Sequence, residues 1–163
     1  MGKVKKIRLT KGKFAIVDDT DYEWLSRWSW CLCGGYAGRT YNPNGRKPPH
    51  YTIFMHREIL GLGFGMTVGD KRQGDHKNRN PLDNRRSNLR VATPSQNQHN
   101  RSKNMKNKSG FKGVSWSDSN NGWIAQIKLN RKAIHLGTFP DPPSAYVAYC
   151  AAALRYHGEF SRV

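Results

Sequence analysis

The sequence is poor in acidic residues and in cysteine, and it has no long apolar run. Its 11 Asp and Glu stand against 28 Lys and Arg, which gives a formal net charge of +17. Basic residues outnumber acidic ones in residues 1–49, 50–100, 101–108 and 109–163 alike. An even excess of this kind is typical of a protein that neutralises nucleic-acid phosphates along much of its length.

Three cysteines are an odd number and too few for a disulfide framework. Cys31 and Cys33 form a C-x-C, and a zinc site would need two further ligands. His50 or His56 could contribute one ligand, but the sequence has no second cysteine pair. We therefore expect Cys31 and Cys33 to be small strand residues, and Cys150, in an alanine-rich stretch, to be a core residue.

The absence of a long apolar run excludes a predicted membrane-spanning helix. The basic segment 1–13 also lacks the apolar stretch and the cleavage site of a signal peptide. The expected location is therefore the cytoplasm.

The first 62 residues predict a β-rich region with short helices. The expected elements are two strands within 7–17, a helix starting at the capping box Thr20–Glu23, two strands within 28–41, a strand at 50–55 and a helix at 56–62. The tryptophans at 24, 28 and 30 have spacings that favour packing in a core.

Residues 71–100 hold the densest run of Asp, His and Asn in the chain. Asp75 and His76 are expected at the end of a strand, Asn88 just before the strand 89–93, and Asn97 one turn into a helix that begins at Thr93. Strand, loop, strand and helix can bring the four side chains together. Carboxylate and amide oxygens suit Mg²⁺ or Mn²⁺, and a neutral imidazole can take a proton from water. These groups suffice for phosphodiester hydrolysis.

A basic, almost apolar-free segment at 101–108 is expected to be a linker. Beyond it, three strands are predicted within 110–139, with hairpin turns near Asn121 and Asn130. A helix capped by Asp141 should follow and end at Gly158.

Residues 51–100 resemble the HNH endonucleases of phage-type homing enzymes, through YTIFMHREILG and GDHKNRNPLDNRRSNLRVATPSQN. The resemblance implies a ββα-metal fold with one divalent metal, Mg²⁺ or Mn²⁺, in each active site. It places metal binding on Asp75 and Asn97, the general base on His76, and its orientation on Asn88. One departure is Gly74, where the family more often has an apolar residue.

Residues 109–163 resemble an AP2 domain, through SGFKGVSW, GWIAQIKL, HLGTF and AYVAYCAAALRYHGEF. In that family a three-stranded sheet lies in the DNA major groove. The resemblance implies DNA contacts at Lys112, Trp116, Trp123, Gln126, Lys128 and His135. Several arginines of the plant transcription factors are replaced here, for example by Ser115 and Gln126, so the base preference does not carry over.

Other basic residues flank the proposed metal or lie in the linker. We expect phosphate contacts rather than a solvated face for Lys77, Arg79, Arg85, Arg86, Arg90, Arg101 and Lys103. The pair His56-Arg57 has two open interpretations, a phosphate contact or a buried, hydrogen-bonded histidine. Asp83 and Asn84 most simply shape a turn, with Asp83 as a second metal ligand the less favoured alternative.

The sequence thus predicts an α+β protein of two modules. A β-rich N-terminal region with an HNH nuclease motif occupies residues 1–100 (HNH core 51–100). After the linker 101–108, an AP2-like three-stranded antiparallel sheet with one helix occupies 109–163. The expected function is a homing-type, sequence-directed endonuclease that acts on double-stranded DNA in a bacterial host. A monomer would nick one strand.

Two rival functions remain at this stage. A non-catalytic AP2-type transcriptional regulator would use the HNH region as a scaffold, although a scaffold does not need the set of Asp75, His76, Asn88 and Asn97. An RNA-directed enzyme is disfavoured because the major groove of A-form RNA is too narrow for a sheet.

Overall fold

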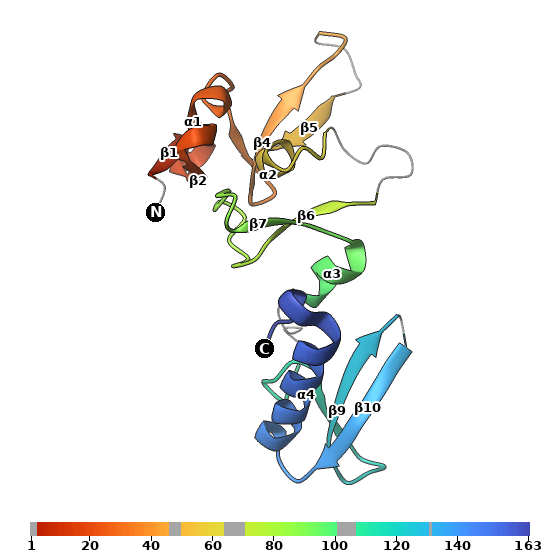
Figure 1. The fold of residues 1–163 in the computed structure, drawn as a ribbon. Coiled ribbons are helices and arrows are strands. Elements are labelled where there is room, and N and C mark those ends of the chain that lie inside the picture. Colours follow the sequence, from red (N-terminus) through yellow and green to blue (C-terminus); the bar gives the residue numbers. More distant parts are fainter. Residues whose placement is uncertain (1–2, 46–49, 64–70, 101–106, 131) are drawn as a thin grey trace. The chain divides into compact units, whose positions relative to one another are not determined.

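The computed structural model describes residues 3–45, 50–63, 71–100, 107–130 and 132–163. The chain divides into two compact units, residues 1–97 and 98–163 (Figure 1). Each unit combines antiparallel sheet with helix, which confirms the expected α+β class. Most of the expected linker, residues 101–106, lies outside the described residues.

Unit 1 contains three small sheets and the helices that connect them. The two-stranded sheets pair β1 with β2 and β6 with β7, and the three-stranded sheet has the order β3-β4-β5. In chain order the elements are β1 (Val4–Arg8), a 3-10 turn (Thr10–Gly12), β2 (Phe14–Asp18), α1 (Asp19–Leu25), β3 (Cys31–Cys33), β4 (Tyr36–Tyr41), β5 (Tyr51–Phe54), α2 (Met55–Ile59), β6 (Gln73–His76), β7 (Leu89–Ala92) and α3 (Pro94–His99), whose last two residues belong to unit 2.

The apolar core of unit 1 joins these sheets. Val17, Leu25 and Met55, from β2, α1 and α2, are fully buried in one cluster, and Leu89 brings β7 into it. Burial of side chains of this size stabilises a fold by about 1.5–3 kcal/mol each. The β6–β7 hairpin is therefore packed on the same core as the N-terminal strands.

The predicted helix starts at Thr20 and Thr93 have different outcomes. At α3 the prediction is confirmed, because Thr93 Oγ1 accepts the Gln96 N–H at 3.2 Å and Gln96 Oε1 accepts the Thr93 N–H at 2.8 Å. At α1 it is wrong, because the helix begins at Asp19 after Asp18, with no side-chain cap. The Asp18 carboxylate accepts the Arg86 N–H at 2.8 Å instead.

Unit 2 is a three-stranded sheet with one long helix packed on it. Its strands are β8 (Val114–Ser117), β9 (Gly122–Leu129) and β10 (Lys132–Phe139), in the order β10-β9-β8, followed by α4 (Pro142–His157) and a 3-10 turn (Gly158–Phe160). Both expected signals of α4 are confirmed: Asp141 Oδ1 accepts the Ser144 N–H at 2.8 Å, and Gly158 follows the helix with a φ of 52°.

Small residues let α4 lie close to the sheet. Ile127 of β9 packs against Tyr149 and Ala153 of α4. A Cβ at Gly113, where φ is 75°, would overlap the ring of Tyr149. One face of the sheet is therefore covered by α4 and the other is open.

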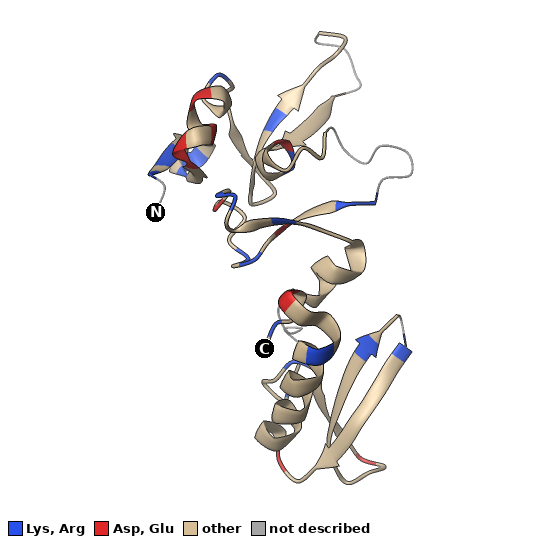
Figure 2. Cartoon of the chain, in the orientation of Figure 1, with Lys and Arg blue, Asp and Glu red and all other residues tan. Residues whose placement is uncertain are grey.

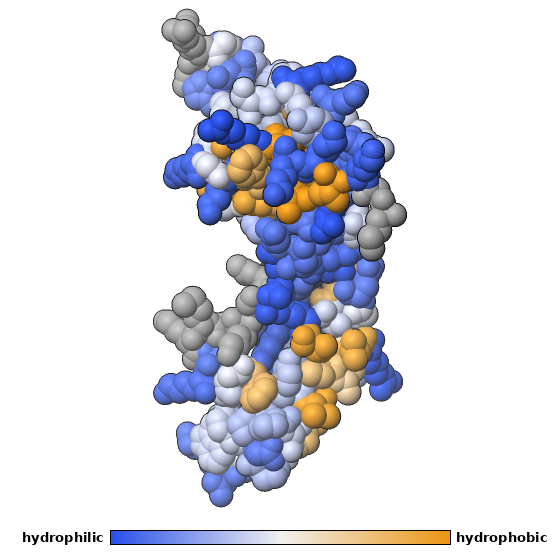
Figure 3. Space-filling view, turned by 90° about the vertical axis from the view of Figure 1, so that its left-hand side faces the viewer, coloured by the Kyte–Doolittle hydropathy of each residue, from blue (hydrophilic) through white to orange (hydrophobic). Residues whose placement is uncertain are grey.

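Basic side chains occur in both units, on β1, around the β6–β7 connection and at the ends of β9 and β10 that face their hairpin turn (Figure 2). The face drawn in Figure 3 is mostly hydrophilic, with apolar groups in each unit. Within the described residues, no helix has the length and apolar content needed to cross a membrane.

Candidate active site

The β6–β7 hairpin carries the predicted catalytic residues. Asp75 lies opposite Arg90 and His76 lies opposite Leu89 in the antiparallel register. Both Asp75 and His76 are 5% exposed. Two adjacent titratable side chains are therefore buried at the point where β6 enters the polar connection 77–88.

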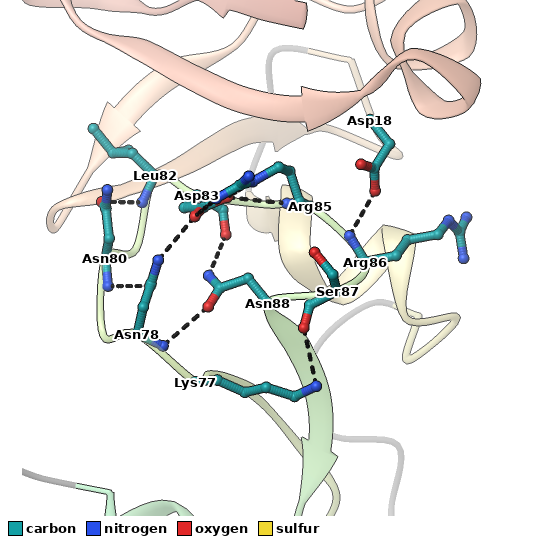
Figure 4. A network of polar contacts seen from close by, with 10 residues as sticks. All are labelled: Asp18, Lys77, Asn78, Asn80, Leu82, Asp83, Arg85, Arg86, Ser87 and Asn88. Carbon is teal, nitrogen blue, oxygen red and sulfur yellow. Dashed lines mark hydrogen bonds and ion pairs between the residues drawn. The ribbon is translucent and has the colours of Figure 1, made fainter. Parts of the chain in front are cut away.

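Hydrogen bonds of Asn88 brace this connection (Figure 4). Asn88 Oδ1 accepts the Asn78 N–H at 2.9 Å, and Asn88 Nδ2 donates to the Asp83 carbonyl at 2.7 Å. Asn78 Nδ2 in turn donates to the Asp83 carboxylate at 2.8 Å. Asn88 thus ties the start, the middle and the end of the connection together.

Asn84, rather than Asn88, contacts the imidazole of His76. Its Oδ1 lies 3.2 Å from His76 Nε2. An amide oxygen only accepts, so this bond places the proton of the neutral ring on Nε2. Asn84 is fully buried and its N–H donates to the Ile16 carbonyl at 2.7 Å. Asn88, which donates to the Asp83 carbonyl, is linked to His76 through the backbone from Asp83 to Asn84.

Burial is the main influence on His76. It lowers the pKa of the imidazole from 6.5, and the hydrogen bond to Asn84 and the charges of Asp75 and Asp83 partly oppose this. The ring is therefore neutral at neutral pH and able to accept a proton. That is the state a general base requires.

Asp75 and Asn97 approach the same face of the hairpin. Gln73 and Asp75 are two residues apart on β6, so their side chains share a face. Gln73 Oε1 accepts a hydrogen bond from Asn97 Nδ2 at 2.8 Å, which brings the helix α3 to that face. Asp75 Oδ2 accepts Arg90 Nε and pairs with Arg90 Nη2, both at 2.8 Å.

Like Arg90, the arginines at 85 and 86, which were expected at phosphates, form ion pairs inside unit 1. Arg85 donates to Asp83 through Nε at 2.8 Å and Nη2 at 2.7 Å, and this bond is the main cause of the lowered pKa of Asp83. Arg86 donates to Asp21 through Nε at 2.8 Å and Nη2 at 2.7 Å. Bidentate pairs of this kind position a backbone, so both arginines fasten the connection 77–88.

The chain matches known HNH proteins over this site and beyond it. Residues 69–99 match the HNH endonuclease family. The chain is 30% identical over 151 residues to "Uncharacterized HNH endonuclease L560" of Acanthamoeba polyphaga mimivirus, which covers 93% of this chain and 74% of that protein.

This chain belongs to the HNH endonuclease family. It is an enzyme that hydrolyses DNA phosphodiester bonds. A second relative, "Protein 3.8" of Escherichia phage T7, is 43% identical over 58 residues, or 36% of this chain and 48% of that protein. No solved structure matches the chain.

The two residues predicted to bind metal have the chemistry for a hard divalent cation. Asp75 and Asn97 would offer a carboxylate and an amide oxygen, and Mg²⁺ takes few protein ligands because it keeps several waters. In the described part of the chain, no three His, Cys, Asp or Glu side chains form a group that could hold a metal. The Sγ atoms of Cys31 and Cys33 lie 3.0 Å apart, and their hydrogen bond raises the pKa of Cys33 to about 11.

An aromatic cluster surrounds His76 that sequence reasoning did not assign to the site. His56 lies 5.0 Å from His76 between ring centroids, and Tyr36 lies 6.0 Å from it. A Cβ on Gly74 would overlap Cδ2 of His56, which explains why this position has no side chain. The sequence signal for His56 was the His-Arg pair. The structure confirms that His56 is buried, but its Nδ1 has no hydrogen-bond partner within the described residues.

The basic residues next to the hairpin differ in their surroundings. Lys77 is exposed and donates to the Ser87 carbonyl at 2.9 Å. Arg79 is exposed in a left-handed turn with a φ of 64°. Arg90 is engaged with Asp75, whereas Arg101 and Lys103 lie outside the described residues.

The six residues expected to contact DNA in unit 2 do not share one surface. Gln126, Lys128 and His135 are exposed, and Gln126 pairs with His135 in register. Alternation along β9 places them opposite the buried Ala125 and Ile127, on the open face. Trp116 and Trp123 pair in register, 5.4 Å apart, on the face of Ala125. Lys112 donates to the His99 carbonyl at 2.5 Å.

Proposed function

We propose that this HNH endonuclease is a homing-type, sequence-directed enzyme that nicks one strand of double-stranded DNA with the help of one divalent metal. The observation that carries the proposal is a buried, neutral His76 beside Asp75, on a hairpin whose connection is fastened by Asn88 and Asn84. We assign Asp75 and Asn97 to metal binding and His76 to the general base.

The chain's own residues supply the proton transfer and the orientation. His76 takes a proton from the attacking water, with Asn84 holding Nε2 so that the other ring nitrogen receives it. Asn88 keeps Asn84 in place through the connection 77–88. Mg²⁺ or Mn²⁺, when bound by Asp75 and Asn97, supplies stabilisation of the negative charge that develops on the phosphate and leaving oxygen.

Unit 2 is proposed as an AP2-like module that provides affinity and register on the duplex. Its open sheet face presents Gln126, Lys128 and His135, a set that can contact base edges and phosphates. One active site hydrolyses one strand, so a monomer is the proposed acting form. The proposed location is the bacterial cytoplasm. Of the two relatives, one is from Escherichia phage T7 and the other from Acanthamoeba polyphaga mimivirus.

Cleavage of supercoiled plasmid tests the proposal. The plasmid is incubated with the protein in Mg²⁺, in Mn²⁺ and in chelator, with His76→Ala alongside. We expect metal-dependent conversion to open circle, and a loss of about 10²- to 10⁴-fold in rate for His76→Ala with duplex binding retained. Linear product at the earliest times would contradict nicking by a monomer.

The control separates catalysis from binding. His135→Ala removes an exposed histidine in unit 2 and should leave the strand-cutting rate at saturating DNA unchanged. A wild-type protein that binds DNA but cuts neither the plasmid nor a library of genomic fragments would overturn the proposal in favour of a DNA-binding regulator.

A further inference from the structure

We propose that His56 is a positioning residue that holds the imidazole of His76 in the orientation needed for proton transfer. This inference rests on the proposed role of His76 as general base. The structure places His56 on α2, about twenty residues before His76 in the chain, and brings the two rings to 5.0 Å with an interplanar angle of 63°.

Packing as well as hydrogen bonding orients the ring of His76. The contact from Nε2 to Asn84 Oδ1 is 3.2 Å long, at the weak end for a hydrogen bond. Neighbouring rings restrict rotation about the Cβ–Cγ bond further. His56 lies 5.0 Å from His76 and Tyr36 lies 6.0 Å from it, between centroids.

His56 is the buried member of this cluster. It is 7% exposed, whereas Tyr36 is 39% exposed. Tyr36 packs on His56 at 5.4 Å and Phe54 stacks on it at 5.8 Å with an interplanar angle of 28°. The ring of His56 therefore packs against side chains from β4 and β5 and contacts His76 of β6.

The glycine at position 74 leaves the space that the His56 ring occupies. A Cβ there would overlap Cδ2 of His56 and lie 3.2 Å from its Nε2. Gly74 has no positive φ, so its backbone does not require glycine. The ring of His56 therefore explains why position 74, two residues before His76, has no side chain.

The chemistry of His56 suits packing rather than proton transfer. Its Nδ1 is buried and has no hydrogen-bond partner within the described residues. Burial, together with the nearby His76 and Arg57, lowers the pKa of His56 to about 3. His56 therefore stays neutral and does not repel the positive charge that His76 acquires when it takes a proton.

The test compares His56→Ala, His56→Phe and His76→Ala in the full-length protein. Single-turnover cleavage and duplex affinity are measured for each, together with the ¹H–¹⁵N signals of the His76 ring in metal-free protein. We expect His56→Ala to cut about 10²-fold more slowly at unchanged duplex affinity, because small displacements of a reacting group cost that much. His56→Phe, which keeps a ring, should restore most of the rate.

A matched control lies on the same helix. Ile59 of α2 is 4% exposed and packs in the apolar core, so Ile59→Ala should destabilise unit 1 and leave the His76 signals and the cleavage rate unchanged under conditions where the protein is folded. A merely structural role for His56 would give the same pattern in His56→Ala, and that result would overturn the inference.

Gly74→Ala gives a second route that keeps the His56 side chain. Its methyl group should displace the His56 ring, shift the His76 signals and slow cleavage as His56→Ala does. In a His56→Ala background the same methyl group meets no ring, so it should add no further loss. Additive losses in the double variant would overturn the inference. Full cleavage by His76→Ala would instead refute the general-base assignment itself.

Discussion

His56 and His76 are buried imidazoles in contact, and burial lowers the pKa of each. Such a pair has a consequence for folding as well as for catalysis. The unfolded chain protonates each ring near its ordinary pKa of 6.5, whereas the folded protein keeps both neutral to lower pH. The unfolded state therefore binds more protons in acid, and the free energy of unfolding falls as the pH drops below 6.5.

His56→Phe should remove the part of this pH dependence of the free energy of unfolding that comes from His56. The folded pKa of His56 is about 3, so this residue alone lowers the free energy of unfolding of the wild type by about 2 kcal/mol between about pH 7 and pH 5. The decrease over the same pH range should be smaller by this amount in the variant. Hydrogen exchange of unit 1 amides, used to monitor urea unfolding at a series of pH values, measures the free energy of unfolding of both proteins. Parallel pH curves for both proteins would show that His56 is protonated in the folded state.

At the level of elements, the connection 77–88 acts as a rigid part of the site because it is fastened to the first hairpin. Ile16 N–H donates to the Leu82 carbonyl at 2.8 Å, and Arg86 reaches Asp21 across 65 residues of sequence. Asp21 is almost fully buried. A carboxylate left there without its cation would be costly.

Arg86→Ala should therefore act on stability and on cleavage rather than on DNA affinity. We expect a loss of about 1–3 kcal/mol in the free energy of unfolding of unit 1 and a slower cut at saturating DNA. The slope of duplex affinity against salt should stay unchanged, because Arg86 neutralises Asp21 and not a phosphate. A slope reduced by about one, at unchanged stability, would instead support the phosphate contact that the sequence predicted.

Gly113→Ala should be among the most damaging single changes in unit 2. The new Cβ would overlap the Tyr149 ring and adopt a φ of 75°, which costs about 1–2 kcal/mol before the overlap is counted. Together with overpacking we expect a loss of about 2–5 kcal/mol. Calorimetry of the full-length protein measures this, with Gly158→Ala, at a φ of 52° and with no atom within 4 Å of the new Cβ, as the comparison.

For the molecule as a whole, the hairpins and the caps of two helices were predictable because they depend on neighbours in sequence. The start of α3, both ends of α4 and the three strands of unit 2 fall in this group, whereas the predicted cap of α1 was wrong. The pair Asp75-His76 was predictable for the same reason. The contacts of His56 and Asn84 with His76 were not, because they depend on which buried groups the packing of α2 and the connection 77–88 brings to His76.

The ion pairs of the arginines escaped prediction for a related reason. A basic residue beside a phosphodiester site has the same sequence signature whether it meets a phosphate or a distant carboxylate. Only folding shows that Asp21 lies beside Arg86 and that Asp75 lies beside Arg90. Net charge therefore indicates the partner of a protein better than it indicates which side chains touch that partner.

The proposed separation of DNA binding in unit 2 from chemistry in unit 1 can be tested by kinetics. If unit 2 supplies affinity and unit 1 the chemistry, a Gln126→Ala, Lys128→Ala, His135→Ala triple variant should bind duplex more weakly and with a salt slope reduced by about one. At saturating DNA it should still cut at the wild-type rate, so KM rises and kcat stays constant. Trp116→Ala, on the opposite face of the sheet, is the matched control and should leave KM unchanged. A fall in kcat with unchanged KM would mean that the open face of unit 2 takes part in the chemical step.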